Sequence, residues 1–379
     1  MKFMNSVTAA GPRRKRWLFT PLRCWRLTAA GVEHAALIVV GFGVLAVLAS
    51  LSRTYWFDEA QTIFNVRHSF LRMLHLVAYD LAPPFYYLLM FAWVRLFGAG
   101  EVVTALPSVA FSLLALWFSY QLGAQFGGQR VGRWTAFLYA ATYAFGWYAQ
   151  ETRMYALVAA CGVASTAAFH RLLIWPQRRD WYWYVGATLV GVYTHYAFWF
   201  LVYAQNVAAL WCRWRSGSKL RLRHWAVAQL LLLLSYLPMA PFLIGVYDRV
   251  SQWYLSGQTT LHLYPPDLPW GPLRNLLGLL FTPLAFWNRF GMFPTWVAVL
   301  QVALVVVAVV PLILHFQYRQ RNLLLTFRLG MDRRVSAVLL FSIIVPLLLL
   351  TILRVTFLRY IIYTVPLVCC LIALGLERG

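Results

Sequence analysis

Residues 32–60 read VEHAALIVVGFGVLAVLASLSRTYWFDEA. This stretch joins an apolar run, from Val32 to Leu51, to a short aromatic segment that is followed by Asp58 and Glu59. A run of about 20 apolar residues is the length that a helix needs to cross a bilayer. Acidic side chains beside such a run are costly, because a charge at the bilayer centre costs about 2.5–3.5 kcal/mol. The two carboxylates therefore predict a functional group at a membrane face.

The composition of the whole chain is that of a membrane protein. Of its 379 residues, 61% are hydrophobic and only 12% are charged, so a soluble domain is excluded. Apolar runs recur from end to end and predict an all-α, polytopic integral membrane protein of one domain, 1–379, with about 10 transmembrane helices. The expected spans are approximately 33–52, 104–121, 134–149, 155–174, 181–196, 197–212, 225–246, 294–314, 335–353 and 360–376.

Basic residues outnumber acidic ones, 33 to 11, and give a net charge of +22. In a chain of this composition the excess indicates loops that fix orientation against anionic lipid, so no nucleic-acid partner is expected. The basic clusters fall on one side of the listed spans, which predicts a multi-pass protein of the inner (plasma) membrane with a cytoplasmic basic tail, 1–32, and a first span retained as an anchor. They include Arg13, Arg14, Lys15, Arg16, Arg130, Arg133, Arg171, Arg178, Arg179, Arg213, Arg215, Lys219, Arg221, Arg223, Arg333 and Arg334.

The segment 84–97 is apolar but is not counted as a span. It holds 14 residues, includes Arg95, and would reverse every later loop if it crossed the membrane. We therefore expect 53–103 to be one external loop that carries two helices on the membrane surface, 59–78 and 84–97. A second external loop is expected at 247–293.

This topology sorts the acidic residues by side and predicts an external site. Acids and arginines mix on the face where the positive-inside rule expects few arginines. The five cysteines show no CxxC or cysteine–histidine spacing, so neither a disulfide framework nor a zinc site is indicated. The acids expected outside are Asp58, Glu59, Asp80, Glu101, Glu151, Asp248 and Asp267.

The pair Asp58-Glu59 is the first candidate for chemistry. Adjacent side chains at the start of a helix point about 100° apart, so the two need not share one role. Asp58 is expected to act as a general base, or to bind a metal or a hydroxyl, in a cleft. The alternative is that both acids only complement the helix dipole. The aromatic collar at 55–57 favours the functional interpretation.

Two further motifs carry acids in the expected external loops. Asp80 precedes Pro83-Pro84, which stop one helix and begin another, and the alternative for this segment is a plain turn. Gln150-Glu151-Thr152-Arg153-Met154-Tyr155 lies between two spans, where Glu151 and Arg153 can face a shared cleft. The alternative for that motif is a surface ion pair, worth less than about 1 kcal/mol.

Two external turns supply basic or titratable groups. Arg354 and Arg359 lie within six residues, followed by Tyr360, and predict a phosphate ligand held by guanidinium groups, with lipid head groups as the alternative. His195, in the turn Thr194-His195-Tyr196, is a weaker candidate. The expected catalytic residues are Asp58 and Glu59, and the expected substrate-binding residues are Asp80, Glu151, Arg153, Tyr155, His195, Arg354, Arg359 and Tyr360.

In this order, the motifs resemble those of the C-type glycosyltransferases, in the branch of the dolichyl-phosphate-mannose protein mannosyltransferases and the bacterial aminoarabinose transferases. The likeness covers roughly residues 33–376. The matching segments are Trp56-Phe57-Asp58-Glu59, Pro83-Pro84-Phe85-Tyr86-Tyr87, Ala105-Leu106-Pro107-Ser108, Gln150-Glu151-Thr152-Arg153-Met154-Tyr155, Arg359-Tyr360 and Pro366.

The resemblance implies an inverting glycosyltransferase with a polyprenyl-phosphate sugar as donor. Asp58 would take the proton of the acceptor hydroxyl, and Arg153, Arg354 and Arg359 would stabilise the leaving phosphate. Some relatives bind a divalent metal, for which Asp80 and Glu59 would be the ligands here; the cofactor is otherwise left unknown. The lipid tail would lie in apolar grooves between spans, and the acceptor, whether glycan, lipid or protein, would meet the loops 53–103 and 247–293.

Two departures from the family pattern concern the same motifs. A histidine often precedes the two prolines, but this chain has Ala82, so its role is lost or moved to His75. An arginine often precedes Leu-Pro-Ser, but this chain has Thr104-Ala105.

The competing hypotheses are a transporter or flippase of lipid-linked sugars, which would carry buried charges near mid-span, and a non-catalytic membrane scaffold.

Overall fold

The structure is a computed structural model that describes residues 54–79, 82–255, 314–319, 322–327, 332–352 and 358–377, together with 41, 43, 45 and 48. Several predictions lie outside the described residues. They concern Asp80, Arg354, the basic tail 1–32, most of the first span, the span 294–314 except for its last residue, and most of the loop 247–293.

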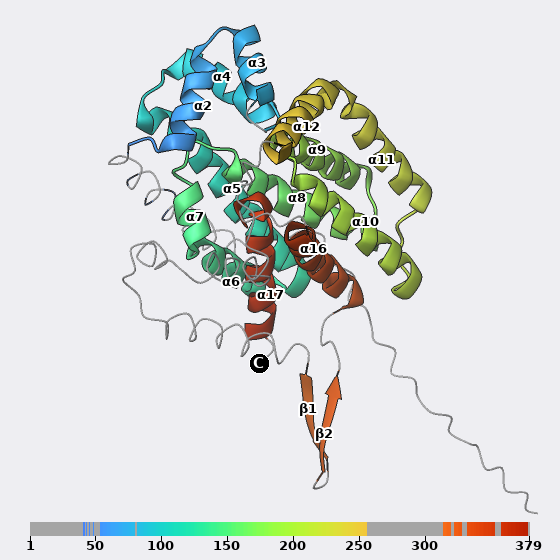
Figure 1. Cartoon of the computed structure of the whole chain (residues 1–379). Coiled ribbons are helices and arrows are strands. Elements are labelled where there is room, and N and C mark those ends of the chain that lie inside the picture. The colour runs from blue at the N-terminus through green and yellow to red at the C-terminus, as the bar shows by residue number, and fades with distance from the viewer. Residues whose placement is uncertain are drawn as a thin grey trace, which may run out of the picture.

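The described part of the chain is a bundle of helices with one small hairpin beside it (Figure 1). The predicted all-helical membrane fold is confirmed. The helices are α2 (Phe57–Arg67), α3 (Phe70–Tyr79), α4 (Phe85–Phe97), α5 (Glu101–Gly127), α6 (Gln129–Ala140), α7 (Tyr143–Tyr148), α8 (Tyr155–Ile174), α9 (Arg178–Thr194), α10 (Phe198–Arg215), α11 (Leu222–Ser235), α12 (Ala240–Leu255), α16 (Arg333–Ile352) and α17 (Thr364–Leu376), with short 3-10 turns η1 (Leu237–Met239) and η2 (Leu358–Ile361).

Helix α8 lies at the centre of the bundle. Every residue from Tyr155 to His170 is buried, and many of them are Ala, Gly or Ser. Small side chains let neighbouring backbones approach closely, which is how helices pack in membranes. Gly162 is an example of such an approach, because a Cβ atom there would overlap the Cβ of Tyr363. This contact fixes the start of α17, and with it the preceding turn η2, against the central helix.

The connection from α4 to α5 depends on a proline. Pro107 has no N–H to donate to the Val103 carbonyl one turn earlier. The indole Nε1–H of Trp93, on α4, donates to that carbonyl at 2.9 Å. A freed backbone acceptor therefore receives a partner from the neighbouring helix, and the contact docks α4 against the start of α5.

Alternating helix directions give the bundle two distinct ends. One end, which we call the acidic end, carries α2, α3, α4, the start of α5, the α7–α8 junction, the α9–α10 turn and η2. At the opposite, basic end, Arg334 Nη2 donates to the Ser216 carbonyl at 3.0 Å, and Arg171 pairs with Asp180 at 2.7 Å. Arg171 and Arg334, from two of the predicted basic clusters, thus lie at this end of the bundle.

The structure divides three predicted segments that were expected to be continuous. The surface helix 59–78 breaks at His68 and Ser69 into α2 and α3. The span 134–149 breaks into α6 and α7, since the Thr142 hydroxyl leaves the helical pattern and accepts the N–H of Phe145 at 3.2 Å as an N-cap. The span 225–246 is interrupted by η1 at Pro238.

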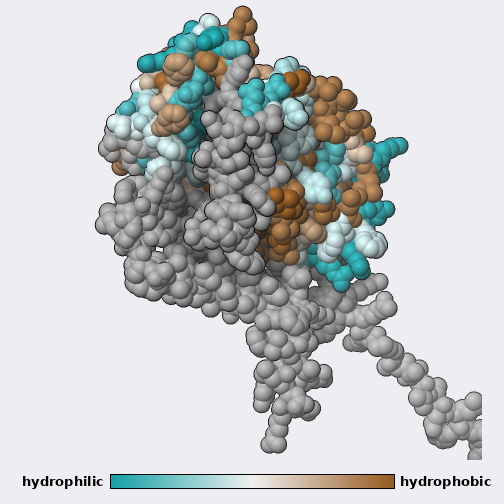
Figure 2. All heavy atoms as spheres, viewed as in Figure 1, coloured by the Kyte–Doolittle hydropathy of each residue, from teal (hydrophilic) through white to brown (hydrophobic). Residues whose placement is uncertain are grey.

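Four helical stretches among the described residues are long and apolar enough to cross a membrane: Glu101–Gly127, Tyr155–Ile174, Leu222–Asp248 and Arg333–Leu350. The chain is a multi-pass membrane protein, and the predicted number of about ten spans stays a prediction. Figure 2 shows apolar side chains gathered over α11 and α12, where Leu237 is 65% exposed, as expected of a lipid-facing surface.

The hairpin was not predicted. It pairs β1 (Leu314–Arg319) with β2 (Asn322–Phe327) as antiparallel strands and lies outside the helical bundle (Figure 1).

Candidate active site

The acidic end of the bundle is organised around the first turn of α2. The Trp56 backbone N–H, just before the helix, donates to Glu59 Oε2 at 3.1 Å, as in one half of a capping box. The other oxygen of Glu59 accepts the backbone N–H of Thr152 at 2.7 Å. Glu59 is only 1% exposed. It therefore joins α2 to the α7–α8 junction, which is remote in sequence.

The α7–α8 junction is also held by α5 and by the collar. The Ser108 hydroxyl, on α5, donates to the Glu151 carbonyl at 2.6 Å. The Trp56 indole donates to Glu151 Oε1 at 3.0 Å. Because both contacts are buried or partly buried, they fix the path of the chain from Glu151 to the start of α8.

Arg153 contacts the first turn of α2 from the protein interior. Its Nη1 donates to the Tyr87 hydroxyl at 3.0 Å, to the Thr62 hydroxyl at 3.0 Å and to the Asp58 carbonyl at 3.3 Å. Arg153 is 8% exposed, so this guanidinium is almost enclosed by protein. The contacts tie α2 and α4 to the junction and hold the backbone of Asp58 in place.

The side chain of Asp58 points toward η2, while its backbone carbonyl contacts Arg153. Its Oδ2 lies 3.1 Å from Nη1 of Arg359 in an ion pair. The two side chains are 21% and 17% exposed, respectively, so the pair is partly accessible. The turn that carries Arg359 is held by the next helix, where the Tyr363 hydroxyl donates to the Ala197 carbonyl at 3.1 Å.

Aromatic rings surround Arg359. Its guanidinium carbon lies 5.4 Å from the ring centre of Tyr155 and 5.8 Å from that of Trp56, distances at which a cation and a ring attract one another. The rings of His195 and Tyr360 lie 4.8 Å apart, and His195 lies 6.1 Å from Tyr155. The result is an aromatic wall around one cation and one carboxylate.

His195 lies in the turn after α9 and is buried. Burial lowers the pKa of its imidazole to about 3, and the nearby guanidinium groups of Arg153 and Arg359 act in the same direction. Its Nδ1 accepts the backbone N–H of Ala197 at 3.1 Å, as a neutral ring can. His195 is therefore a neutral member of the site at physiological pH.

The structure thus brings together eight of the ten residues selected from the sequence. These eight residues come from four separate segments of the chain and are Asp58, Glu59, Glu151, Arg153, Tyr155, His195, Arg359 and Tyr360. Asp80 and Arg354 lie outside the described residues.

The expected metal ligands Asp80 and Glu59 stay a prediction, because Asp80 lies outside the described residues. Both oxygens of Glu59 already accept backbone N–H groups, and no group of three His, Cys, Asp or Glu side chains that could hold a metal ion lies among the described residues.

Sequence reasoning assigned no role to four residues that shape the site. Tyr87 and Thr62 accept hydrogen bonds from Arg153, Ser108 holds the Glu151 backbone, and the ring of Tyr148 contacts that of Tyr155 with ring centres 5.1 Å apart. Tyr87 and Ser108 stood inside matched motifs. The positions of Thr62 and Tyr148 carry no signal beyond their residue type.

Replacing Glu59 by Gln should destabilise the acidic end. A glutamine has one acceptor oxygen and would turn an NH2 group toward one of the two backbone N–H donors. Leaving that buried donor without an acceptor costs about 1–3 kcal/mol. We expect a lower Tm for Glu59→Gln than for wild type in thermal unfolding of the purified protein. The control is Glu101→Gln, which changes an exposed acid at the same end and should leave the Tm unchanged. Equal Tm values for both variants would contradict the role given to Glu59.

The fold and the site together define the class of this protein. It is a multi-pass membrane protein with a partly accessible acid–arginine pair at one end of a helical bundle. The fold is that of ArnT, an aminoarabinose transferase and C-type glycosyltransferase, as the resemblance implied. The crystal structure of ArnT from Cupriavidus metallidurans bound to undecaprenyl phosphate matches 93% of this chain with a TM-score of 0.59 and 14% identity. The apo structure of the same protein matches 92% with a TM-score of 0.57 and 15% identity.

The similarity to ArnT extends only to the fold, for two reasons. This chain spans 61% and 60% of the two ArnT chains, respectively, and the identities are low. No protein-family model matches the sequence, and no curated protein sequence matches it.

Proposed function

We propose that this protein is an inverting glycosyltransferase that moves a sugar from a polyprenyl-phosphate carrier to a hydroxyl acceptor at the extracytoplasmic face of the membrane. The observation that carries the proposal is the ion pair between Asp58 and Arg359, at 3.1 Å. It supports the proposal because a carboxylate and a guanidinium this close together could act on one reactant, Asp58 as the proposed base and Arg359 as the proposed phosphate ligand. Undecaprenyl phosphate in the ArnT crystal structure is a carrier of the expected kind.

In the proposed reaction, the phosphate of the donor binds Arg359 and takes the place of the Asp58 carboxylate. Asp58 then accepts the proton of the acceptor hydroxyl while the hydroxyl oxygen attacks the anomeric carbon. The bond between that carbon and the phosphate oxygen breaks, and its electron pair leaves with the phosphate. Arg359 stabilises the charge that builds on the leaving group. Attack from the face opposite the leaving group inverts the anomeric centre.

The other site residues position these two. Glu59 and Arg153 hold the first turn of α2 from either side, through the contacts given above. Tyr155, Trp56 and Tyr360 form apolar walls that lower the local dielectric around Arg359, which strengthens its attraction for a phosphate. Arg354 remains a further candidate for the phosphate.

The active site is assigned to the extracytoplasmic side because the arginine-rich end of the bundle is the opposite one. With this orientation the amino-terminal tail is cytoplasmic and the protein lies in the inner (plasma) membrane. The helices α2, α3 and α4 then rest at the outer surface, where α4, with 13 residues, is too short to cross.

A transporter or flippase is the alternative from another class. It would be expected to carry charged groups near mid-span. The polar network in the middle of the described bundle joins Ser165, Thr188 and Gln205, which are all uncharged, through contacts of 2.9 and 3.1 Å. This observation favours the enzyme.

The test is transfer by the purified protein in lipid nanodiscs. A panel of synthetic polyprenyl-phosphate pentoses and hexoses, labelled in the sugar, would be incubated with a membrane extract as acceptor. Release of polyprenyl phosphate together with label on the acceptor supports the proposal. Movement of the labelled lipid between leaflets of proteoliposomes, without cleavage, would instead support the flippase.

A further inference from the structure

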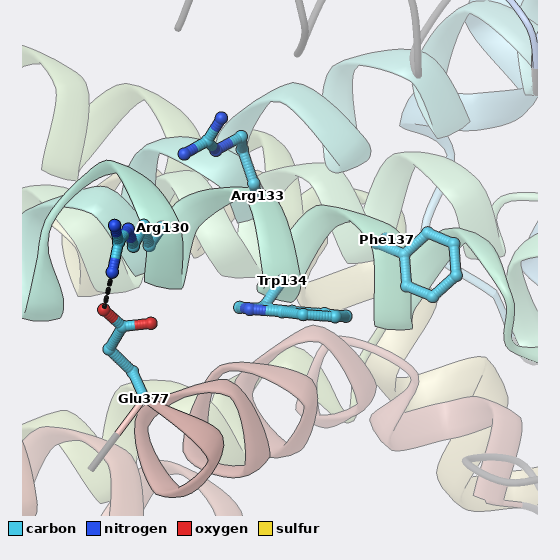
Figure 3. A pocket seen from close by; sticks show the side chains of 5 residues that line it. All are labelled: Arg130, Arg133, Trp134, Phe137 and Glu377. Carbon is cyan, nitrogen blue, oxygen red and sulfur yellow. Dashed lines mark ion pairs between the residues drawn. The ribbon is translucent and has the colours of Figure 1, made fainter.

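A hollow lies at the basic end of the bundle, between α6 and the end of α17 (Figure 3). It has a volume of about 610 Å³ and is lined by Arg130, Arg133, Trp134, Phe137 and Glu377. The four residues of α6 recur at spacings of three and four, so they lie along one side of that helix. The transfer reaction proposed above uses none of them.

The lining divides into a charged rim and an aromatic part. Arg130 is paired with Glu377 at 3.5 Å, and the two side chains are 75% and 32% exposed, respectively. Trp134 and Phe137 lie edge to face with ring centres 6.0 Å apart, and both are about half exposed. In a membrane protein, large aromatic side chains at the end of a span mark the level of the lipid head groups.

Charge complementarity selects the occupant. The rim carries two arginines and one carboxylate, a net charge of +1, which matches a phosphate diester with a single negative charge. Guanidinium groups bind phosphate oxygens through directed hydrogen bonds. Basic pockets beside spanning helices on the arginine-rich side are sites for anionic lipid head groups. The aromatic pair continues the hollow as an apolar surface suited to an acyl chain.

We propose that this hollow binds the head group of one anionic phospholipid from the leaflet at the basic end. The phosphate lies between Arg130 and Arg133, and the start of an acyl chain lies against Trp134 and Phe137. Glu377 weakens the site because it competes for Arg130. The lipid would fasten α6 to α17, and the turn before α17 carries Arg359 at the other end.

The experiment is native mass spectrometry of the full chain in non-ionic detergent, with phosphatidylglycerol or phosphatidylcholine of matched acyl chains. Wild-type protein is expected to retain one phosphatidylglycerol in preference to phosphatidylcholine. The double variant Arg130→Gln/Arg133→Gln should bind phosphatidylglycerol about tenfold more weakly, the effect of losing a charge-assisted hydrogen bond. Glu377→Gln should bind it several-fold more tightly, because the competing carboxylate is gone.

The control variant is Arg178→Gln/Arg179→Gln, which removes the same charge from exposed positions at the same end of the bundle. It should retain the lipid like the wild type. An equal loss in this control, or the absence of a gain in Glu377→Gln, would overturn the site. Displacement of the lipid by soluble glycerol 3-phosphate at comparable concentration would overturn the lipid assignment, since the site would then bind a free phosphate. Misfolding would only weaken lipid binding, so tighter binding by Glu377→Gln together with weaker binding by Arg130→Gln/Arg133→Gln separates an effect on the site from misfolding.

Discussion

Asp58→Asn should lower the rate of sugar transfer by about 10²- to 10⁴-fold, the contribution of a positioned general base. Asparagine keeps the shape of the side chain but cannot take the proton of the acceptor hydroxyl. It also removes the partner of Arg359, so the donor phosphate should bind at least as well as in wild type. The expected pattern is therefore a large loss in kcat with little change in the KM for the donor.

Two further measurements make the result specific. Glu101→Gln removes an exposed acid from the same end of the bundle and should leave transfer unchanged. Asp58→Glu, which keeps the carboxylate but moves it by one methylene, should retain more activity than Asp58→Asn. If Asp58→Asn were monodisperse after purification and transferred sugar within about threefold of wild type, Asp58 would not be the base.

Arg359→Gln should lower kcat/KM by about 10²- to 10³-fold, as the loss of a group that stabilises developing charge does elsewhere. The physical reason is the position of Arg359, which lies 17% exposed between aromatic rings and has Asp58 as its ion-pair partner. Both donor affinity and turnover should fall, since the guanidinium binds the phosphate before and during bond breakage. Kinetics with varied donor concentration would measure both.

Arg359→Lys distinguishes charge from geometry. Lysine keeps the charge but lacks the planar fork, so activity should lie between wild type and Arg359→Gln. Arg72→Gln, at an exposed position on α3, serves as the matched loss of an arginine at the same end and should have wild-type kinetics. A drop in Arg72→Gln as large as that in Arg359→Gln would mean that the general field, and not this guanidinium, attracts the donor.

Much of the site was predictable because rare residues are informative in an apolar chain. Asp58, Arg153 and Arg359 were selected since charge near a membrane has a desolvation cost and needs a purpose. The sequence did not show which of the charged side chains pair with one another. Glu59 and Arg153 look like candidate reactants in the linear sequence, but in the structure they hold the first turn of α2, while Asp58 pairs with Arg359.

The local breaks in the helices, like the hairpin, were not predicted from the sequence. Apolar periodicity continues through Thr142 and through His68-Ser69, so the segments 134–149 and 59–78 were expected to be single helices. The breaks arise from side chains that bond to backbone groups, such as the Thr142 hydroxyl, and these bonds compete with the helical pattern. Periodicity records which face is apolar, and it does not record such local competition.

By itself, the sequence determined that this protein spans the membrane more than once, and it predicted that most basic clusters lie on one side, because apolar length and charge cost are properties of single segments. Only the tertiary structure decided which of the remaining charges meet. Arg359 reaches Asp58 because Gly162 lets the start of α17 approach α8, and because Glu59 and Arg153 fix the first turn of α2. Contacts between segments 300 residues apart depend on packing, which the linear order of residues does not contain.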